Sequence, residues 1–558
     1  MSKNIAHTLT ETARELGSRT AVTEARNGQS CSFMELDRYA DRYGAYFTSK
    51  GVNSGDRVML MVKPSIDFIA LAFALFRIGA PVILIDPGMG YKNLLRCIAS
   101  VKPDYLVGIP AVVGLSILLG NKFSSLKKRF CCGRFLGISA LDIRRKREVE
   151  QVSIGTFHPD ETSLAAIIFT TGSTGPPKGV RFEHSIFSAQ LEKIRSYYGI
   201  GRGDIDQPGF PLFALFSTAL GAHAVIPDMD PTRPAQVNPQ KFVRSIQDYQ
   251  VTYSFGSPAI WQAVSRYCQE NNIRCTSLKK VLMAGAPVSG DLVRQVFAII
   301  AENGQIHTPY GATECLPIVS MEGSDIVSKT WEDTKKGKGT CVGKPLPGIT
   351  VKIIAASDSV LEDIDKCTML GPGKRGEIIV KGDEVTRAYD GNVSQNLASK
   401  IKDGEGFWHR IGDVGYTDTQ GRLWFCGRMA HRVFSRAGAM YTICCEALIN
   451  NHPEVFRSAL VGIDSEDDYQ TPVMIIELHK PITRNVQIII AEIKTICADH
   501  TLLENLAHVL VHKTIPEDNR HNSKIYREKL AVGAQQQERK RSSNQTRKLD
   551  EPGVSPLR

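Results

Sequence analysis

The chain has 558 residues, 42% of them hydrophobic and 23% charged, with a formal net charge of +10 at pH 7. This length exceeds what one hydrophobic core usually supports, so we expect at least two domains. The thirteen cysteines include no paired C-x-x-C, which excludes a structural zinc site and a disulfide framework and is typical of reduced cytoplasmic thiols. The basic residues do not interleave with aromatic ones, which excludes nucleic acid as a partner.

The first segment, MSKNIAHTLTETARELG, is predicted to form an amphipathic helix and lacks the charged-then-apolar pattern of an export signal, which indicates a cytoplasmic protein. An apolar stretch at residues 105–120 precedes basic residues at 127–129 and 144–147, and it is shorter than the roughly 20 residues that span a membrane. Two interpretations stay open: a buried strand and helix followed by a solvated face, or a membrane-associated surface that contacts anionic lipid.

Further along, short apolar runs such as RVMLMV, APVILID, LAAIIFT and KKVLMAG alternate with segments of helical periodicity at residues 67–77 and 291–301. Strands that alternate with helices predict an α/β fold with largely parallel sheets. From about residue 341, short strands and glycine-rich turns predict a β-rich subdomain. We therefore expect a large N-terminal domain at residues 1–427, a small mobile α+β C-terminal domain at 428–530, and a disordered basic tail at 531–558.

A phosphate-binding loop is predicted directly after the apolar strand LAAIIF. Its glycines let the backbone approach phosphate oxygens, its hydroxyl and amide groups donate hydrogen bonds, and its lysine supplies positive charge. The loop differs from the Walker loop, which needs glycine where Pro177 stands. A Gly/Ser/Thr turn that only links two elements is the alternative. The nucleotide-binding residues expected here are Thr170, Thr171, Gly172, Ser173, Thr174, Gly175 and Lys178.

This string, TTGSTGPPKG, resembles the phosphate loop of the adenylate-forming (AMP-binding) enzymes, a superfamily that includes acyl-CoA synthetases and peptide-synthetase adenylation domains. The resemblance covers nearly the whole chain before the tail, and it implies that ATP and Mg²⁺ serve to join a carboxylic acid to AMP. The motif Tyr310-Gly311-Ala312-Thr313-Glu314 matches the same family. It implies that the Tyr310 ring stacks on adenine, that Thr313 contacts phosphate and that Glu314 binds Mg²⁺, which suits a flat ring and a hard carboxylate oxygen.

Further positions match the nucleotide-binding pattern of the family. Gly285, Ala286 and Pro287 resemble the segment that lines the adenine and acyl pocket, although a tight turn after a strand would use the same residues. Asp413 matches the aspartate that accepts hydrogen bonds from the ribose hydroxyls, with a local cap of a glycine turn as the alternative. Arg428 matches the arginine that contacts ribose and phosphate, and its alternative is a surface arginine.

The last match is IPEDNRHNSKIYREKL, in which Lys524 resembles the catalytic lysine of the family's closing motif. When a carboxylate attacks the α-phosphorus of ATP, negative charge grows on the phosphoryl oxygens as pyrophosphate leaves. A cation brought in by a mobile domain stabilises that charge. The resemblance implies that Lys524 acts with Glu314 and Thr313 as the catalytic set, whereas a lysine near a chain end is otherwise only solvated.

The chain departs from the family pattern at two positions after Arg428. Ala430 replaces the usual hinge Asp or Lys, and Phe434 stands near the lysine expected in CoA ligases, which makes the use of CoA doubtful. Upstream, residues 211–216 (PLFALF) lack the histidine that often closes the acyl pocket. An apolar lining there suits a long alkyl chain, and a plain core strand is the alternative.

These departures, together with LFRIGAPVILIDPGMGYKNLLRCI and RHNSKIYREKL, resemble the β-lactone synthetases of olefin biosynthesis. That resemblance implies that a long-chain 2-alkyl-3-hydroxy acid is adenylated, that its own hydroxyl then expels AMP without CoA, and that an olefin-pathway enzyme assembly is a partner. Long-chain fatty acid-CoA ligation and an inactive acyl-binding scaffold are the alternatives. His184, His431 and His521 are candidate bases for ring closure, each with a packing or surface role as the alternative.

Overall fold

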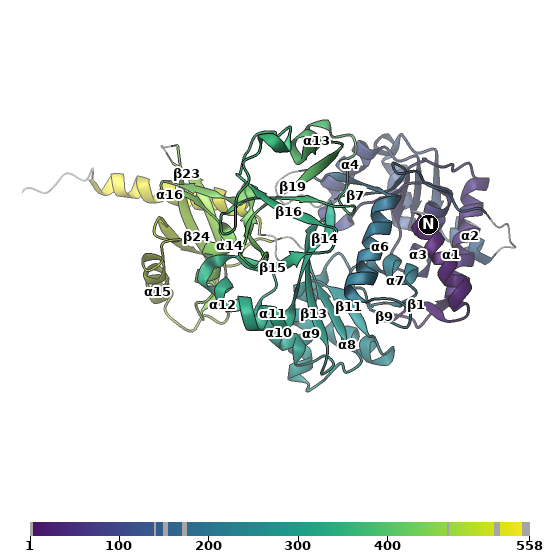
Figure 1. Ribbon diagram of the computed structural model, residues 1–558, viewed down its shortest axis with the longest axis horizontal. Coiled ribbons are helices and arrows are strands. Elements are labelled where there is room, and N and C mark those ends of the chain that lie inside the picture. The colour runs from purple at the N-terminus through teal and green to yellow at the C-terminus, as the bar shows by residue number, and fades with distance from the viewer. Residues whose placement is uncertain are drawn as a thin grey trace, which may run out of the picture.

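The computed structural model describes residues 4–138, 141–148, 154–169, 176–465, 468–517 and 525–549. Figure 1 shows an elongated molecule with the N-terminal helices at one end and α16 at the other. Residues 170–175 of the predicted phosphate loop, and the segment 518–524 that contains His521 and Lys524, lie outside the described residues.

The first sheet is an α/β unit in which short buried strands alternate with helices, as the hydrophobic runs predict. Its strand order is β6-β5-β3-β4-β7-β8, and neighbours are parallel except β7 and β8. Ser65 caps the first turn of α3, and Gly79 ends that helix in the left-handed region with φ of 72°. The elements are β3 (Val58–Met61), α3 (Ile66–Ile78), β4 (Val82–Leu84), α4 (Tyr91–Val101), β5 (Tyr105–Gly108), α5 (Pro110–Leu118), β6 (Lys128–Cys131), β7 (Leu164–Phe169) and β8 (Gly179–Glu183).

The second sheet has the order β16-β17-β19-β20-β15-β14-β13-β12-β11-β9-β10-β1-β2, with β18 paired to β19. Its strands β9 to β13 are parallel to their neighbours, and the direction reverses between β13 and β14, at the Tyr310–Glu314 motif. The elements of this half are α1 (Ile5–Leu16), β1 (Thr20–Glu24), β2 (Ser30–Ser32), α2 (Phe33–Ser49), α6 (His184–Tyr198), β9 (Ile205–Asp206), α7 (Phe213–Ala219), β10 (His223–Ile226), α8 (Pro239–Asp248), β11 (Tyr253–Gly256), α9 (Pro258–Glu270), β12 (Lys280–Met283), α10 (Gly290–Phe297), β13 (Gln305–Ala312) and β14 (Cys315–Glu322).

The other half of this sheet is antiparallel and corresponds to the β-rich subdomain predicted from residue 341 onward. A short helical segment, with α11 (Gly323–Asp325) and α12 (Trp331–Asp333), leads into it. The remaining elements are β15 (Thr340–Pro345), β16 (Thr350–Ile354), β17 (Gly376–Lys381), α13 (Val393–Ser399), β18 (Lys400–Asp403), β19 (Gly406–Thr417) and β20 (Leu423–Arg428). The α/β fold class is therefore confirmed for the large part of the chain.

A small α+β region follows, and it has a hydrophobic core of its own. Leu460, Met474 and Ile476 of the sheet pack with Ile489 and Ile493 of α15. Strand β24 pairs antiparallel with β23 and parallel with β25. The elements are β21 (Val433–Ser435), β22 (Gly438–Met440), α14 (Thr442–Ile449), β23 (Val455–Asp464), β24 (Gln470–Leu478), α15 (Val486–Ala498), β25 (His508–Val511) and α16 (Arg527–Leu549). The domain boundaries at residues 427 and 530 stay predictions.

The tail differs from the disorder predicted for residues 531–558, because α16 continues to Leu549. Leu530 and Ala534 are buried and pack against Val461 and Ile475 of the small sheet. These apolar contacts dock the first turns of α16, although the average composition of the segment is strongly polar. The prediction of disorder is therefore wrong for the first part of the tail.

The apolar stretch at residues 105–120 forms β5 and α5, and none of the helices in the described ranges combines the length and apolar character that a membrane crossing requires. Basic residues that follow are paired with carboxylates. Lys127 lies 3.0 Å from both Asp56 and Asp104, and Arg147 lies 2.9 Å from Asp67. This pairing favours the interpretation as a solvated face, and contact with anionic lipid stays a prediction.

Candidate active site

Tyr310, Asp413 and Arg428 form one group, the nucleotide group, which is joined by a hydrogen bond and an ion pair. The Tyr310 hydroxyl donates to Asp413 Oδ2 at 2.6 Å, and Arg428 Nη1 lies 2.9 Å from Asp413 Oδ1. Asp413 and Arg428 face each other in the register of β19 and β20, which explains their pairing. Burial, aided by the charge of Asp413, raises the pKa of Tyr310, so its hydroxyl stays protonated and donates. The carboxylate predicted to accept from ribose is thus fixed on both oxygens.

Glu314 lies beside this group and is held by a residue that the sequence did not indicate. The Tyr389 hydroxyl donates to Glu314 Oε1 at 2.7 Å, and the Lys178 ammonium lies 5.1 Å from the centre of the Tyr389 ring. Burial lowers the pKa of Lys178, the negative charge of Glu314 opposes that shift, and Arg428 adds to it. Lys178, Glu314 and Arg428 therefore share one electrostatic environment, as a triphosphate site requires.

Lys400 is a further residue near this site that the sequence did not indicate. Its ammonium donates to the carbonyl of Thr386, and the backbone N–H of Thr386 in turn donates to the carbonyl of Glu314 at 2.8 Å. The Phe407 ring centre lies 4.7 Å from the Lys400 nitrogen. Burial lowers the pKa of Lys400 to about 7, against the opposing charge of Glu314. A single lysine in a polar segment carries no pattern, so only the tertiary structure finds it.

The predicted adenine-lining turn directly follows β12. Gly285 has φ of +97°, a backbone conformation that side-chain-bearing residues rarely adopt, which explains glycine at this position. Ala286 continues the turn at a partly exposed position and Pro287 at an exposed one. Because β12 and β13 are parallel neighbours, this turn and the Tyr310 motif lie at the same edge of the sheet.

Gly311 and Thr313 lie where β13 turns back into β14. A Cβ on Gly311 would lie only 2.3 Å from the Cys315 carbonyl oxygen, so no larger residue fits. The register of the two strands shifts at this position. Thr313 precedes Glu314 in the tight turn, half-buried, beside the carboxylate that is predicted to bind Mg²⁺.

The ends of the predicted phosphate loop are described although its residues 170–175 are not. Strands β7 and β8 pair antiparallel with Phe169 opposite Gly179, so the loop closes a hairpin. Lys178, directly before β8, therefore stands at the base of the loop. The contacts of Thr170, Thr171, Gly172, Ser173, Thr174 and Gly175 with phosphate stay predictions.

The segment that carries Lys524 is likewise held at its two ends. Glu517 and Ile525 form an isolated antiparallel β-bridge. Directly after it, Arg527 donates to both oxygens of Glu446, at 2.5 and 3.0 Å. Burial raises the pKa of Glu446, and the Arg527 charge opposes this shift. A buried bidentate ion pair of this kind fixes the position at which the segment rejoins the small sheet.

The three histidines predicted as candidate bases have different surroundings. His184 is buried in the core with its ring centre 6.0 Å from that of Phe76, and burial lowers its pKa to about 4. It is a packing residue. His431 also has a pKa lowered to about 4 by burial, with the nearby charges of Arg527 and Arg428 adding to the shift. His521 lies outside the described residues.

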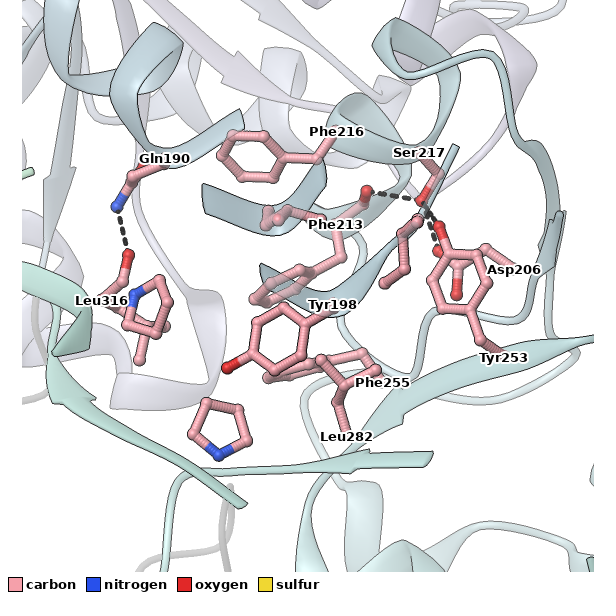
Figure 2. A pocket seen from close by; sticks show the side chains of 14 residues that line it. Gln190, Tyr198, Asp206, Phe213, Phe216, Ser217, Tyr253, Phe255, Leu282 and Leu316 are labelled. Carbon is pink, nitrogen blue, oxygen red and sulfur yellow. Dashed lines mark hydrogen bonds between the residues drawn. The ribbon is translucent and has the colours of Figure 1, made fainter. Parts of the chain in front are cut away.

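An apolar pocket adjoins the Tyr310–Glu314 motif, because Pro309, Leu316 and Pro317 are among its walls. Figure 2 shows Phe213 and Phe216 of α7 turned toward this space, and the ring of Phe213 stacks on that of Phe255 with centres 3.8 Å apart. Of residues 211–216, Phe213 and Phe216 line this pocket, and they lie on a helix rather than a strand. That this lining holds a long alkyl chain stays a prediction. The other walls are Gln190, Ile194, Tyr198, Ile200, Asp206, Ser217, Tyr253 and Leu282.

A polar cluster of Asp206, Ser217 and Tyr253 lies on the side of this pocket away from Gln190 and Leu316 (Figure 2). Ser217 Oγ lies 2.5 Å from Asp206 Oδ2, 3.0 Å from the Tyr253 hydroxyl and 2.9 Å from the Phe213 carbonyl. Burial raises the pKa of Asp206 to about 8. A neutral Asp206 can therefore donate to Ser217 Oγ, which in turn donates a hydrogen bond to the Phe213 carbonyl.

This arrangement predicts how stability depends on pH. The unfolded chain loses the Asp206 proton near pH 3.8, whereas the folded chain keeps it to about pH 8. Between these values the folded state binds more protons, so stability falls as pH rises. Asp206→Asn keeps a donor to Ser217 and removes the titration. Its free energy of unfolding relative to wild type should therefore rise by up to about 1.4 kcal/mol per pH unit in this window.

Urea unfolding of both proteins at about pH 5 and about pH 7 measures this difference. Asp248→Asn, at an exposed position of α8, is the control and should give a difference that does not change with pH. A difference for Asp206→Asn that is equally flat would show that Asp206 is ionised in the folded protein.

Comparison with known proteins places these residues in a family. A family model described as AMP-binding enzyme matches residues 9–390. An olefin beta-lactone synthetase of Xanthomonas campestris is 38% identical in an alignment that covers 96% of this chain and 98% of the relative. One of Stenotrophomonas maltophilia is also 38% identical, over 97% of this chain and 99% of the relative.

Solved structures share the fold. ATP-bound MatB from Rhodopseudomonas palustris superposes with a TM-score of 0.78 at 18% identity, covering 96% of this chain and 99% of that one. O-succinylbenzoate coenzyme A synthetase from Bacillus subtilis, in complex with AMP, gives a TM-score of 0.74 at 21% identity, covering 94% and 97% of the two chains. At these identities the likeness establishes the architecture alone.

Proposed function

The chain belongs to the family of AMP-binding enzymes, and on this premise we propose that it adenylates a long-chain 2-alkyl-3-hydroxy acid and closes the adenylate to a β-lactone. It is an ATP-dependent adenylate-forming enzyme. The observation that carries the proposal is that the nucleotide group and the apolar pocket meet at residues 309–317, so a chain in the pocket can present its carboxylate to ATP. The full-length similarity to β-lactone synthetases supports the lactone as product.

Each residue of the candidate site has its own role in the first half-reaction, the formation of the adenylate. Asp413, fixed by Tyr310 and Arg428, accepts from the ribose hydroxyls, and Lys178 and the preceding loop bind the phosphates. Glu314 suits Mg²⁺, which proteins bind through one or two carboxylates together with substrate phosphates. The bound ion would neutralise phosphate charge. A substrate carboxylate oxygen attacks the α-phosphorus, the bond to the β-phosphate breaks, and pyrophosphate leaves while Lys524 stabilises the developing charge.

The second half-reaction needs no further substrate. The 3-hydroxyl oxygen attacks the acyl carbon, the bond from that carbon to AMP breaks, and the hydroxyl proton passes to a base. Because the nucleophile is on the same molecule, folding the chain in the pocket supplies the proximity that a second substrate would otherwise need. Ala430 and Phe434 in place of polar residues agree with the absence of a CoA step. Of the predicted bases, His431 and His521 remain candidates.

A pair of acids tests the proposal. With MgATP and without CoA, the 2-alkyl-3-hydroxy acid should release AMP and pyrophosphate over many turnovers. The same acid without the 3-hydroxyl should give pyrophosphate only once per enzyme molecule, because its adenylate has no internal nucleophile. Continuous AMP release from both acids would reject lactone closure, and no pyrophosphate from either would reject the hydroxy acid as substrate.

Glu314→Gln is expected to raise the Mg²⁺ concentration needed for half-maximal pyrophosphate release by at least about tenfold, because an amide oxygen carries no charge for the ion. Tyr389→Phe is the matched control, since it removes the hydrogen bond at 2.7 Å and leaves the carboxylate in place. Its effect on the Mg²⁺ requirement should be smaller. Equal Mg²⁺ curves for Glu314→Gln and wild type would remove Glu314 from the metal site.

A further inference from the structure

A second apolar cavity lies on a different face of α7 from the first pocket. The residues that line it include Phe68, Ile69, Pro211, Ala214, Ile226 and Met229. Every residue that lines it is apolar or glycine, so its side chains offer no hydrogen bond to a ligand. Its walls suit a saturated hydrocarbon chain.

The two cavities share a wall. Phe213, Phe216 and Ser217 line the first pocket, and their spacing places them on one face of α7, whereas Ala214 lines the second cavity. The contact continues before the helix, where the N–H of Gly209, in the wall of the second cavity, donates to the Phe255 carbonyl at 2.7 Å. One short segment, residues 208–217, therefore separates two apolar spaces.

A 2-alkyl-3-hydroxy acid has two alkyl arms on adjacent carbons, and its carboxylate is held at a single point by adenylation. The arms must therefore diverge close to the site. Leaving one of them in water would forfeit its hydrophobic stabilisation, which grows with each buried methylene. We propose that the first pocket and the second cavity each receive one alkyl arm of the substrate, with α7 as the partition between them. This inference rests on the proposed function and names the shape of its substrate.

Two variants that fill one space each test the proposal. Met229→Trp narrows the second cavity, and Ile194→Phe narrows the first pocket. Both residues are half-buried in the wild-type protein. The substrates are two isomeric acids, one with a long 2-alkyl arm and a short 3-alkyl arm, and the other with these lengths exchanged. A third acid carries two short arms. The measured quantity is kcat/KM for pyrophosphate release.

Met229→Trp should lower kcat/KM by at least about tenfold for one isomer and leave the short-armed acid unchanged, because only a long arm meets the new ring. Ile194→Phe should lower it for the other isomer. If both variants disfavour the same isomer, or if Met229→Trp changes neither, the two-cavity assignment is wrong. Should Met229→Trp fail to fold, Ala214→Val fills the same cavity by two methyl groups and carries the test. Wild-type protein inactive with all three acids would instead overturn the proposed function.

Discussion

Lys524→Ala is expected to lower the rate of pyrophosphate release by at least about a hundredfold while MgATP still binds, because the lysine acts on charge that develops in the transition state. Single-turnover pyrophosphate release measures the chemical step, and equilibrium binding of a nonhydrolysable ATP analogue measures affinity. The substitution should affect catalysis and not the fold. The β-bridge between Glu517 and Ile525 and the ion pair of Arg527 with Glu446 hold the segment at its ends without Lys524.

Lys529→Ala is the control for this variant, since Lys529 is an exposed lysine five positions further along, on the first turns of α16. It should retain wild-type rates. A Lys524→Ala protein that releases pyrophosphate at the wild-type rate would remove this lysine from the catalytic set. Loss of rate together with loss of ATP affinity would assign it to ground-state binding instead.

Asp413→Ala is expected to lower kcat/KM for ATP by about thirtyfold or more. The change removes the carboxylate that accepts from ribose, and a hydrogen bond to a charged group contributes about 2 kcal/mol. Initial rates at varied ATP concentration measure the effect.

Tyr310→Phe separates the two roles at this group. It keeps a ring that can stack on adenine and removes only the hydrogen bond to Asp413. The fall in kcat/KM for ATP should therefore correspond to one hydrogen bond, about 1 kcal/mol. An Asp413→Ala protein with wild-type KM for ATP would mean that Asp413 is a structural cap of its turn, which is the alternative that the sequence left open.

The layout of the fold could be predicted because its signals are periodic. Short apolar runs that alternate with helical segments identified the parallel sheets, and glycine-rich turns identified the antiparallel half. The tail could not be predicted from composition. Two residues, Leu530 and Ala534, dock the start of α16, and their contribution disappears in the average of a polar segment. The same limit applies to residues 211–216, where an apolar run fits a strand and a helix equally well.

The candidate site divides in the same way. Tyr310, Asp413 and Arg428 lie in short motifs, and the structure joins them in one group. Tyr389 and Lys400 act through tertiary contacts with Glu314, and single residues of these types carry no signal in a sequence. Burial decides the character of His184 and of the Asp206 cluster, and burial is a property of the folded chain.

The account depends most directly on the identity of the organic product when CoA is present. The measurement is mass spectrometry of the product formed from purified protein, MgATP, CoA and a long-chain 2-alkyl-3-hydroxy acid. We predict a compound with the mass of the acid less one water, formed in equal amount with AMP and pyrophosphate and unaffected by CoA. A CoA thioester of the acid, with no lactone, would contradict the account and place the protein among the acyl-CoA ligases.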